Sequence, residues 1–306
     1  MNPVQTNMQP PASAQNLGTG NSTSRRAWRR FRRSKLAFVG LVVVALMAIL
    51  ALAAPLVAQQ DPLKNDLLNR SKPPSAEHIF GTDRTGRDVF SRTIYGGRIS
   101  LLVGLVAVTL SVSIGTVLGL VSGFYGGLVD NIVMRLTDVI MAFPPIIIIM
   151  AAVPIVANLL PSEATIYGIM AVIGLLTWPQ LARLIRGQTL VLHGAEYVIA
   201  AQGLGASKAR QMFVHILPQT LASLLVFATF GIASAILLEA GLSFLGQGVQ
   251  PPTPSWGNMV ETARSLDILE NLPWTWAAPG MAIVITVISI NFIGDALRDA
   301  VDPKSK

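Results

Sequence analysis

The amino-acid sequence predicts an all-α polytopic membrane protein with six transmembrane helices. Of its 306 residues, 52% are hydrophobic and only 13% are charged, and the mean hydropathy is +0.56. A water-soluble domain with so few charged residues could not cover its surface with polar side chains. Six apolar runs are long enough to cross a hydrocarbon layer about 30 Å thick, which requires about 20 helical residues. They are residues 36–58, 99–123, 139–160, 164–182, 221–245 and 276–294.

A basic, polar tail, residues 1–35, precedes the first apolar run. Its first 24 residues are rich in Asn, Gln, Ser, Pro and Gly, a composition typical of disordered chain. Residues 25–35, RRAWRRFRRSK, contain seven cations. Since Lys and Arg are retained on the cytoplasmic side, we expect a cytoplasmic N-terminus, and six spans would return the C-terminal tail, residues 298–306, to that side.

The first run is interpreted as a membrane helix rather than a cleaved leader. The sequence ALAAP near its end resembles a cleavage site, but the run is longer than the core of about 7–15 residues found in signal peptides. The polar segment 59–98 that follows is expected outside, extended at first and helical near GRDVFSRTIYGGRIS. Its seven cations go against this orientation, although five acids accompany them and the segment is long.

The second run carries a ridge of small residues, one every four positions. That spacing places them on one helix face, where they let another helix approach closely. Packing within the chain is favoured, and a subunit interface is the alternative. The ridge comprises Ala107, Ser111, Gly115, Gly119, Gly123 and Gly127.

The third and fourth runs are interrupted by prolines, which membrane helices tolerate when neighbouring helices satisfy the freed backbone groups. The prolines are Pro144, Pro145, Pro154 and Pro161. Asp138 follows Arg135 by three residues, so we expect a structural ion pair near the cytoplasmic interface.

The loop between the fourth and fifth runs, residues 183–220, is predicted to form two short helices that meet at Gly205. Residues 195–204 favour the first helix, with Tyr197, Ala201 and Leu204 on one face, and glycine suits a left-handed cap after it. Ser207 can cap the second helix, and Pro218 would end it.

The second helix of this loop is predicted to be amphipathic. Lys208, Arg210 and Gln211 would face away from its apolar side. The pattern leaves three fates open: the loop lies on the membrane surface, packs under its own spans, or docks in the groove of a partner. The apolar side would consist of Ala209, Met212, Phe213, Ile216 and Leu217.

Several function classes lack the residues that they need. There is no cysteine, and His78, His193 and His215 are far apart, so no metal site is expected. No G-x-x-x-x-G-K-[ST] phosphate loop is present, and no Ser/His/Asp arrangement indicates an enzyme. A self-sufficient secondary transporter would need coupling-ion sites and an inverted repeat, whereas only Glu239 lies deep in a span and no repeat is visible. Nothing indicates a nucleic-acid partner.

The stretch AAQGLGASKARQMFVHILP, residues 200–218, resembles the EAA loop of binding-protein-dependent ABC importer permeases. That loop reads Glu-Ala-Ala, three residues, Gly, nine residues, Ile, any residue, Leu-Pro. Here Ile199 stands in place of the Glu and His215 in place of the Ile, so the polar contacts of the loop can differ from those of the family. Between residues 30 and 304 the chain resembles the C-type permease subunit of dipeptide/oligopeptide ABC importers, through FGTDRTGRDVFSRTIYGGRISL (80–101), MRLTDVIMAFPP (134–145), LARLIRGQTL (181–190), LSFLGQGVQPPTPSWG (242–257) and GDALRDAVDPK (294–304).

The resemblance implies the type I ABC importer permease fold in a bacterial or archaeal cell (inner) membrane. Residues 99–297 would form a five-helix core that contains the coupling loop 183–220. The implied partners are the lipid bilayer, a homologous permease, two cytoplasmic ATPases and an extracellular or periplasmic peptide-binding protein. ATP and Mg would be bound by the ATPases, and this chain would bind no cofactor. The implied substrates are dipeptides or longer peptides, with glutathione-like compounds and metal chelates as alternatives.

The resemblance also assigns roles to residues of this chain. The external sequence QPPTPSWG would contact the binding protein, with Trp256 either part of that contact or a plain interfacial anchor. Glu239 would belong to the solute path or outer gate, or else would bond a neighbouring helix end and fix packing; burying it costs roughly 3 kcal/mol. The path would also be lined by Thr229, Ser234, Ser289 and Asn291. An ATPase would grip Glu196, Ala200, Ala201, Gly205, Ala206, Lys208, Arg210, His215, Leu217 and Pro218.

Overall fold

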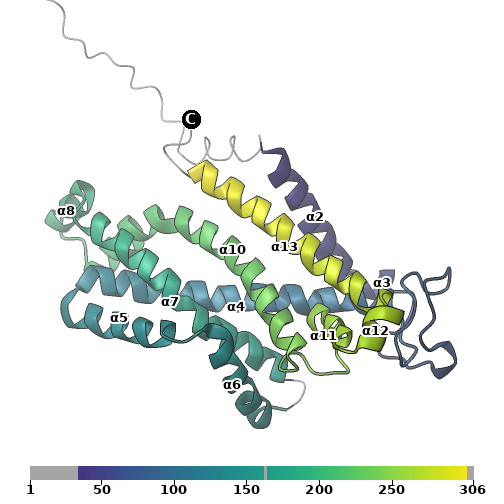
Figure 1. The fold of residues 1–306 in the computed structure, drawn as a ribbon. Helices are drawn as coiled ribbons and strands as arrows, with labels where there is room; N and C mark the ends of the chain where they lie inside the picture. Colours follow the sequence, from purple (N-terminus) through teal and green to yellow (C-terminus); the bar gives the residue numbers. More distant parts are fainter. Residues whose placement is uncertain (1–33, 162–163, 302–306) are drawn as a thin grey trace, which may run out of the picture.

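The computed structural model describes residues 34–161 and 164–301, and within these ranges the chain is helical and contains no strand (Figure 1). The predicted disordered tail therefore lies almost entirely outside the described residues. The helices are α2 (Lys35–Leu52), α3 (Ala54–Val57), η1 (Leu67–Asn69), α4 (Val89–Tyr125), α5 (Gly127–Met141), α6 (Pro145–Leu159), α7 (Thr165–His193), α8 (Glu196–Gly203), α9 (Lys208–Arg210), η2 (Gln211–Ile216), α10 (Leu217–Phe244), α11 (Trp256–Glu261), η3 (Thr262–Arg264), α12 (Leu266–Asn271) and α13 (Trp274–Val301).

Five continuous helices are long and apolar enough to cross a membrane: α2, α4, α7, the run Lys208–Phe244 and α13. The predicted span 139–160 is wrong as a single helix, because its first residues belong to α5 and the rest to α6, which is bent by 87° from α5. The chain turns at Pro144, whose backbone is extended (ψ 127°). A residue that precedes proline disfavours the helical region, so two adjacent prolines stop α5 and start α6. Counted as one broken span, the pair gives the sixth.

The helices extend beyond the apolar runs from which they were predicted. Asp88 caps α4 by accepting a hydrogen bond from the Ser91 amide (2.7 Å), so this helix begins ten residues before the predicted span and the preceding segment ends at Asp88. At its other end, α7 continues to His193, well into the predicted loop, and α13 continues into the predicted tail. An apolar run indicates only the part of a helix that lipid surrounds. The helix itself continues into polar sequence as long as its backbone hydrogen bonds continue.

The small-residue ridge of α4 packs against α7 of the same chain. A Cβ atom added to Gly115, Gly119 or Gly123 would lie 2.9, 2.6 or 2.7 Å from the nearest α7 atom, so only glycine permits this approach. Gly174 on α7 contributes to the same close packing from the other helix, because a Cβ added to it would lie 2.8 Å from the Ala107 carbonyl oxygen. Gly127 is not part of the ridge, because α4 ends at Tyr125 and Gly127 is exposed at the start of α5.

The remaining long helices pack beside this pair. Between α4 and α13 lies α10, which contacts both. Helix α2 lies along α13, and a Cβ on Gly40 would lie 2.5 Å from the Ser289 carbonyl oxygen. Ala37 and Ala296 are buried together, so the first turn of α2 and the last turns of α13 lie side by side (Figure 1).

Candidate functional site

The candidate site begins with a sharp turn between α8 and α9, residues 204–207, which projects from one end of the bundle (Figure 1). Gly205 has a φ of +83°, in the left-handed region that glycine adopts at little cost. Its amide donates to the Gln202 carbonyl (2.9 Å) and the Ala206 amide to the Ala201 carbonyl (3.0 Å), which closes the end of α8. Ser207 accepts a hydrogen bond from the Arg210 amide (3.3 Å) and starts the next helix. We call residues 196–218 the elbow.

A small set of apolar side chains anchors the elbow to the bundle. Val198 from α8 and Met212 and Ile216 from η2 are buried in one cluster with residues of α4, α7 and α10. The structure corrects the predicted apolar side, because Phe213 is exposed and Gln211 is buried, donating to the Ala206 carbonyl (2.9 Å). Residues Gln211–Ile216 form a π-helical turn. A π turn contains more residues than an α turn, so the side that faces the bundle shifts away from the α-helical periodicity.

The second helix of the elbow does not end at Pro218. Proline lies in the first turn of α10, and α9, η2 and α10 continue as one membrane-crossing run, Lys208–Phe244. The missing amide of a proline is tolerated in a first turn, and the preceding π turn makes room for the ring. The elbow is therefore joined to α10 without an intervening loop.

The outer face of the elbow combines cations with exposed apolar side chains. Glu196, Ala200, Gly205, Lys208, Arg210 and Pro218 are exposed, while Ala201, Ala206, His215 and Leu217 are partly buried. The exposed apolar side chains are Ile199, Leu204 (90% exposed), Phe213 and Val214; Leu204 and Phe213 were predicted on the apolar sides of the two short helices, whereas Ile199 and Val214 were not. Contiguous exposed apolar residues rimmed by charge are typical of a protein interaction surface.

Two ion pairs, one partly buried and one exposed, hold α5 against the end of α7 beside the elbow. Asp130 accepts two hydrogen bonds from the Arg186 guanidinium (2.5 and 2.6 Å) and one from the Ser122 hydroxyl (2.5 Å), which joins α4, α5 and α7. Asp138 pairs with Arg183 of α7, and the expected Arg135–Asp138 pair is not the one that forms. A partner on another helix is a tertiary contact that spacing along one helix does not reveal.

A hollow of about 170 Å³ lies between α4, α7 and α10, and four polar side chains stand among its mostly apolar lining. Ser111 of α4 lines it with a hydroxyl that has no hydrogen-bond partner among the described residues. Thr177 and Gln180 of α7 also line it, as does Ser234 of α10. Uncharged polar groups in such a hollow can exchange hydrogen bonds with a passing solute.

The other predicted path residues lie elsewhere. Thr229 donates to the Leu225 carbonyl within its own helix (2.8 Å). Ser289 is buried, with its carbonyl beside Gly40 of α2, and Asn291 lies on the same helix, α13, which does not line the hollow. Of the five candidates, Ser234 alone lines the hollow; Ser111 was predicted only as a ridge residue, and no spacing in the sequence distinguishes Thr177 or Gln180.

Glu239 is fully buried and holds the short helix α11 in place. It accepts hydrogen bonds from the hydroxyls of Ser243 (2.8 Å) and Ser255 (3.0 Å), and Ser255 caps α11. A Cβ on Gly257 would lie 2.9 Å from the Glu239 carboxylate, so α11 rests directly on this group. This geometry favours the packing interpretation of Glu239 over a role in the solute path.

Trp256 is not an exposed anchor. It is 2% exposed, its amide donates to the Ser100 hydroxyl (3.1 Å) and its indole nitrogen donates to the Thr93 carbonyl (2.8 Å). The tryptophan thus fixes α11 to α4, and the exposed part of QPPTPSWG is limited to residues 250–253.

Comparison with known proteins identifies the family. The profile described as binding-protein-dependent transport system inner membrane component matches residues 115–306, and the profile described as N-terminal TM domain of oligopeptide transport permease C matches residues 22–74. The chain belongs to the binding-protein-dependent transport system inner membrane component family. It is thus a multi-pass membrane permease subunit of the ABC transporter class, not a catalytic subunit.

Three relatives cover almost the whole permease. A putative peptide permease protein of Brucella suis biovar 1 is 44% identical over 292 residues, 95% of each chain. The oligopeptide transport system permease protein OppC of Bacillus subtilis is 41% identical over 311 residues, 99% of each chain. The glutathione transport system permease protein GsiD of Escherichia coli is 41% identical over 280 residues, 91% of this chain and 90% of the relative.

Two features of the permease, the elbow and the hollow, are connected through the same helices. The elbow lies at the junction of α7 and α10, and the same two helices supply most of the polar lining of the hollow. Among the described residues, no group of three or more His, Cys, Asp or Glu is placed to hold a metal ion. The elbow and the hollow thus share two helices, α7 and α10.

Proposed function

We propose that this chain is the permease subunit of an ATP-driven peptide importer in the bacterial or archaeal cell (inner) membrane. With a homologous permease it forms the path for dipeptides or oligopeptides delivered by an external binding protein. Two ATPase subunits bind ATP and Mg, since the sequence carries no phosphate loop of its own. The family and the peptide and oligopeptide permeases among its relatives support this proposal.

The proposed orientation places the elbow and both chain ends in the cytoplasm. The start of α2 and the end of α13 lie side by side, which requires an even number of crossings. Five continuous helices then need the bent pair α5–α6 as a sixth crossing. Seven cations in residues 25–35 favour the cytoplasmic side for the start of α2. The turn after α7 and before α10 falls on that same side.

The single observation that carries the coupling role is the elbow itself. It projects as an exposed turn with glycine in a left-handed conformation, and an added Cβ at Gly205 meets no atom within 4 Å. An ATPase groove that receives this turn would contact the apolar and cationic face formed by Leu204, Phe213, Lys208 and Arg210. When the ATPases close, displacement of the elbow moves α7 and α10 together and opens or closes the hollow by alternating access.

The test is substitution of Gly205 by tryptophan in the complete importer reconstituted in proteoliposomes. Because the position is open, the bulky side chain leaves packing of the chain intact, and the strain of a left-handed residue costs roughly 1–2 kcal/mol. We expect assembled complexes to lose most transport and most peptide-stimulated ATP hydrolysis. Wild-type transport by an assembled Gly205→Trp complex would refute the coupling role.

Two matched variants separate bulk from backbone strain. Gly205→Ala carries the left-handed strain without the bulk, so it should retain most transport. Gly127→Trp places the same bulk at another exposed glycine with positive φ (+53°), outside the elbow, and should transport normally. Equal loss in all three variants would indicate a general effect on folding instead.

A second candidate substrate is a glutathione-like compound, because a glutathione transport permease is similar over 91% of the chain. Transport of labelled dipeptide, longer peptide and glutathione by the same proteoliposomes, each with the cognate binding protein outside, distinguishes the two. Peptide transport without glutathione transport supports the main proposal.

A further inference from the structure

A cavity of about 620 Å³ lies at the end of the bundle away from the elbow, between the first turn of α4 with the segment before it and the helices α11 and η3. Its volume is within the range of small-molecule binding sites, about 300–1,000 Å³. Five charged side chains line it: Asp83, Arg87, Arg92, Glu261 and Arg264. The cavity shares no lining residue with the elbow or with the hollow between α4, α7 and α10.

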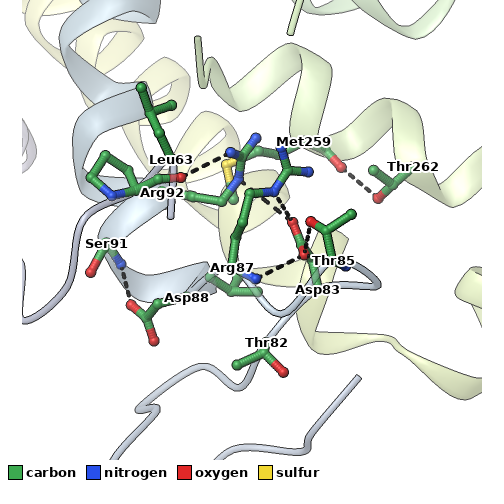
Figure 2. A network of polar contacts seen from close by, with 12 residues as sticks. Leu63, Thr82, Asp83, Thr85, Arg87, Asp88, Ser91, Arg92, Met259 and Thr262 are labelled. Carbon is green, nitrogen blue, oxygen red and sulfur yellow. Dashed lines mark hydrogen bonds and ion pairs between the residues drawn. The ribbon is translucent and has the colours of Figure 1, made fainter. Parts of the chain in front are cut away.

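The two carboxylates of the cavity already have partners. Asp83 accepts hydrogen bonds from the Thr85 amide (2.8 Å) and hydroxyl (2.7 Å) and from the Arg87 amide (3.0 Å) and Nε (2.7 Å), as Figure 2 shows. These bonds leave Asp83 as a fixed anion at the floor of the cavity. Glu261 lies 3.5 Å from Arg264 on the opposite wall.

Arg92 is the exception. Its side chain is 6% exposed, and its guanidinium makes one hydrogen bond, from Nη1 to the Pro62 carbonyl (3.1 Å), with Nε 3.9 Å from Asp83. A guanidinium has five N–H donors, so most of those on Arg92 have no partner among the described residues. Figure 2 shows the ends of Arg87 and Arg92 converging above Asp83. The Arg92 nitrogens are not among the fully enclosed atoms that lack a partner, so the free donors open onto the cavity, where an oxygen ligand can accept from them.

We propose that this cavity binds a carboxylate that arrives from the outer side of the membrane. Three guanidinium groups face two engaged carboxylates, so the lining keeps one net positive charge, and adjacent guanidinium groups suit a planar oxyanion. The inference rests on the proposed function, which supplies two sources of the carboxylate: the C-terminus of the peptide cargo, and an acidic side chain of the binding protein. Arg92 is the central contact, and the exposed Arg264 lies at the rim.

The experiment uses the complete importer in proteoliposomes, with its binding protein outside. Transport of a labelled dipeptide and of its C-terminal amide is measured with Arg92→Gln, and the affinity of the importer for the peptide-free binding protein is measured in parallel. Arg84→Gln is the matched control, because Arg84 lies in the same segment but pairs with Asp267 outside the cavity. Co-purification of all subunits verifies assembly.

For a cargo carboxylate, Arg92→Gln raises the half-saturating concentration of the free acid at least about tenfold and leaves that of the amide unchanged. For a binding-protein carboxylate, both peptides are weakened equally and affinity for the peptide-free binding protein falls by a similar factor. Either result supports the site, provided that Arg84→Gln behaves as wild type.

The proposal is overturned when assembled Arg92→Gln transports both peptides and binds the binding protein as the wild type does. Should Arg92→Gln fail to assemble, Arg264→Gln decides with the same measurements, because that side chain is 55% exposed and its loss does not disturb the fold. Its effect is expected to be smaller, about threefold, and no change in Arg264→Gln then overturns the proposal. Failure of the wild-type importer to transport any peptide counts against the proposed function rather than this site.

Discussion

The close packing of α4 on α7 predicts opposite effects for alanine at two glycines. A Cβ at Gly119 would lie 2.6 Å from the Ala182 carbonyl oxygen and 2.8 Å from the Ile185 Cβ. Ordinary contact begins at 3.4 Å, so the shortfall is about 0.8 Å (3.4 − 2.6) and falls on backbone that cannot rotate away. Gly187 on α7 has no atom within 4 Å of an added Cβ, so it provides the matched control.

The expected magnitudes follow from two terms. Alanine favours a helix over glycine by up to about 1 kcal/mol, which both substitutions gain. Only Gly119→Ala also overpacks the interface, at a cost of about 1–3 kcal/mol. We therefore expect Gly119→Ala to be about 1–3 kcal/mol less stable than Gly187→Ala, with Gly115→Ala (nearest atom 2.9 Å) less affected than Gly119→Ala.

The assay is unfolding of the purified permease in one detergent, by heat and by denaturant, for wild type and the three variants. Two-state fits of the denaturant curves give the free energies of unfolding. Equal stability of Gly119→Ala and Gly187→Ala would show that the ridge does not depend on close approach, and the packing argument for α4 and α7 would fail.

Substitutions at Glu239 and at Asp83 test two further sets of hydrogen bonds. Glu239→Ala should lower the free energy of unfolding by about 1–3 kcal/mol, because it leaves the buried Ser243 and Ser255 hydroxyls without their acceptor. Glu239→Gln keeps an acceptor oxygen and should lower it by less. Equal losses for the two variants in denaturant unfolding would contradict the hydrogen-bonding role of Glu239. Burial raises the pKa of Asp83, but hydrogen bonds from Thr85 and the charge and hydrogen bonds of Arg87 outweigh it and lower the pKa below the ordinary 3.8. The stability that ionised Asp83 contributes is therefore complete above about pH 4 and is lost as the pH falls through the lowered pKa. Asp83→Asn should make the unfolding midpoint less dependent on pH in the acid range. An unchanged dependence of the midpoint on pH would refute this.

The elbow shows which features the local sequence pattern predicts. Gly205 and Ser207 were predicted as cap residues, and both act as caps, because capping depends on a few adjacent residues. The orientation of the second helix was not predictable to the same extent. A π turn at Gln211–Ile216 rotates the buried side, and α-helical periodicity contains no sign of it.

The ion pairs of α5 and the residues that line the hollow could not be predicted, because they depend on contacts between distant segments. Asp138 has a basic residue three positions before it, yet its partner Arg183 lies 45 residues away in the chain. Ser111 was recognised only as a member of the small-residue ridge and Gln180 has no distinguishing spacing, and the two line one hollow with Ser234 only because α4, α7 and α10 converge. The inward-facing side of each helix is set by its neighbours.

The sequence by itself determined that the chain is an all-α membrane permease, because twenty-residue apolar runs have no other stable arrangement in lipid and the loop motif is read from contiguous residues. Only the tertiary structure sets the bend between α5 and α6, the burial of Trp256 against α4 and of Glu239 under α11, and the position of Arg92 in the lining of its cavity. Hydrophobicity and capping are properties of neighbouring residues, whereas burial and hydrogen-bond satisfaction depend on which distant segments the fold brings together.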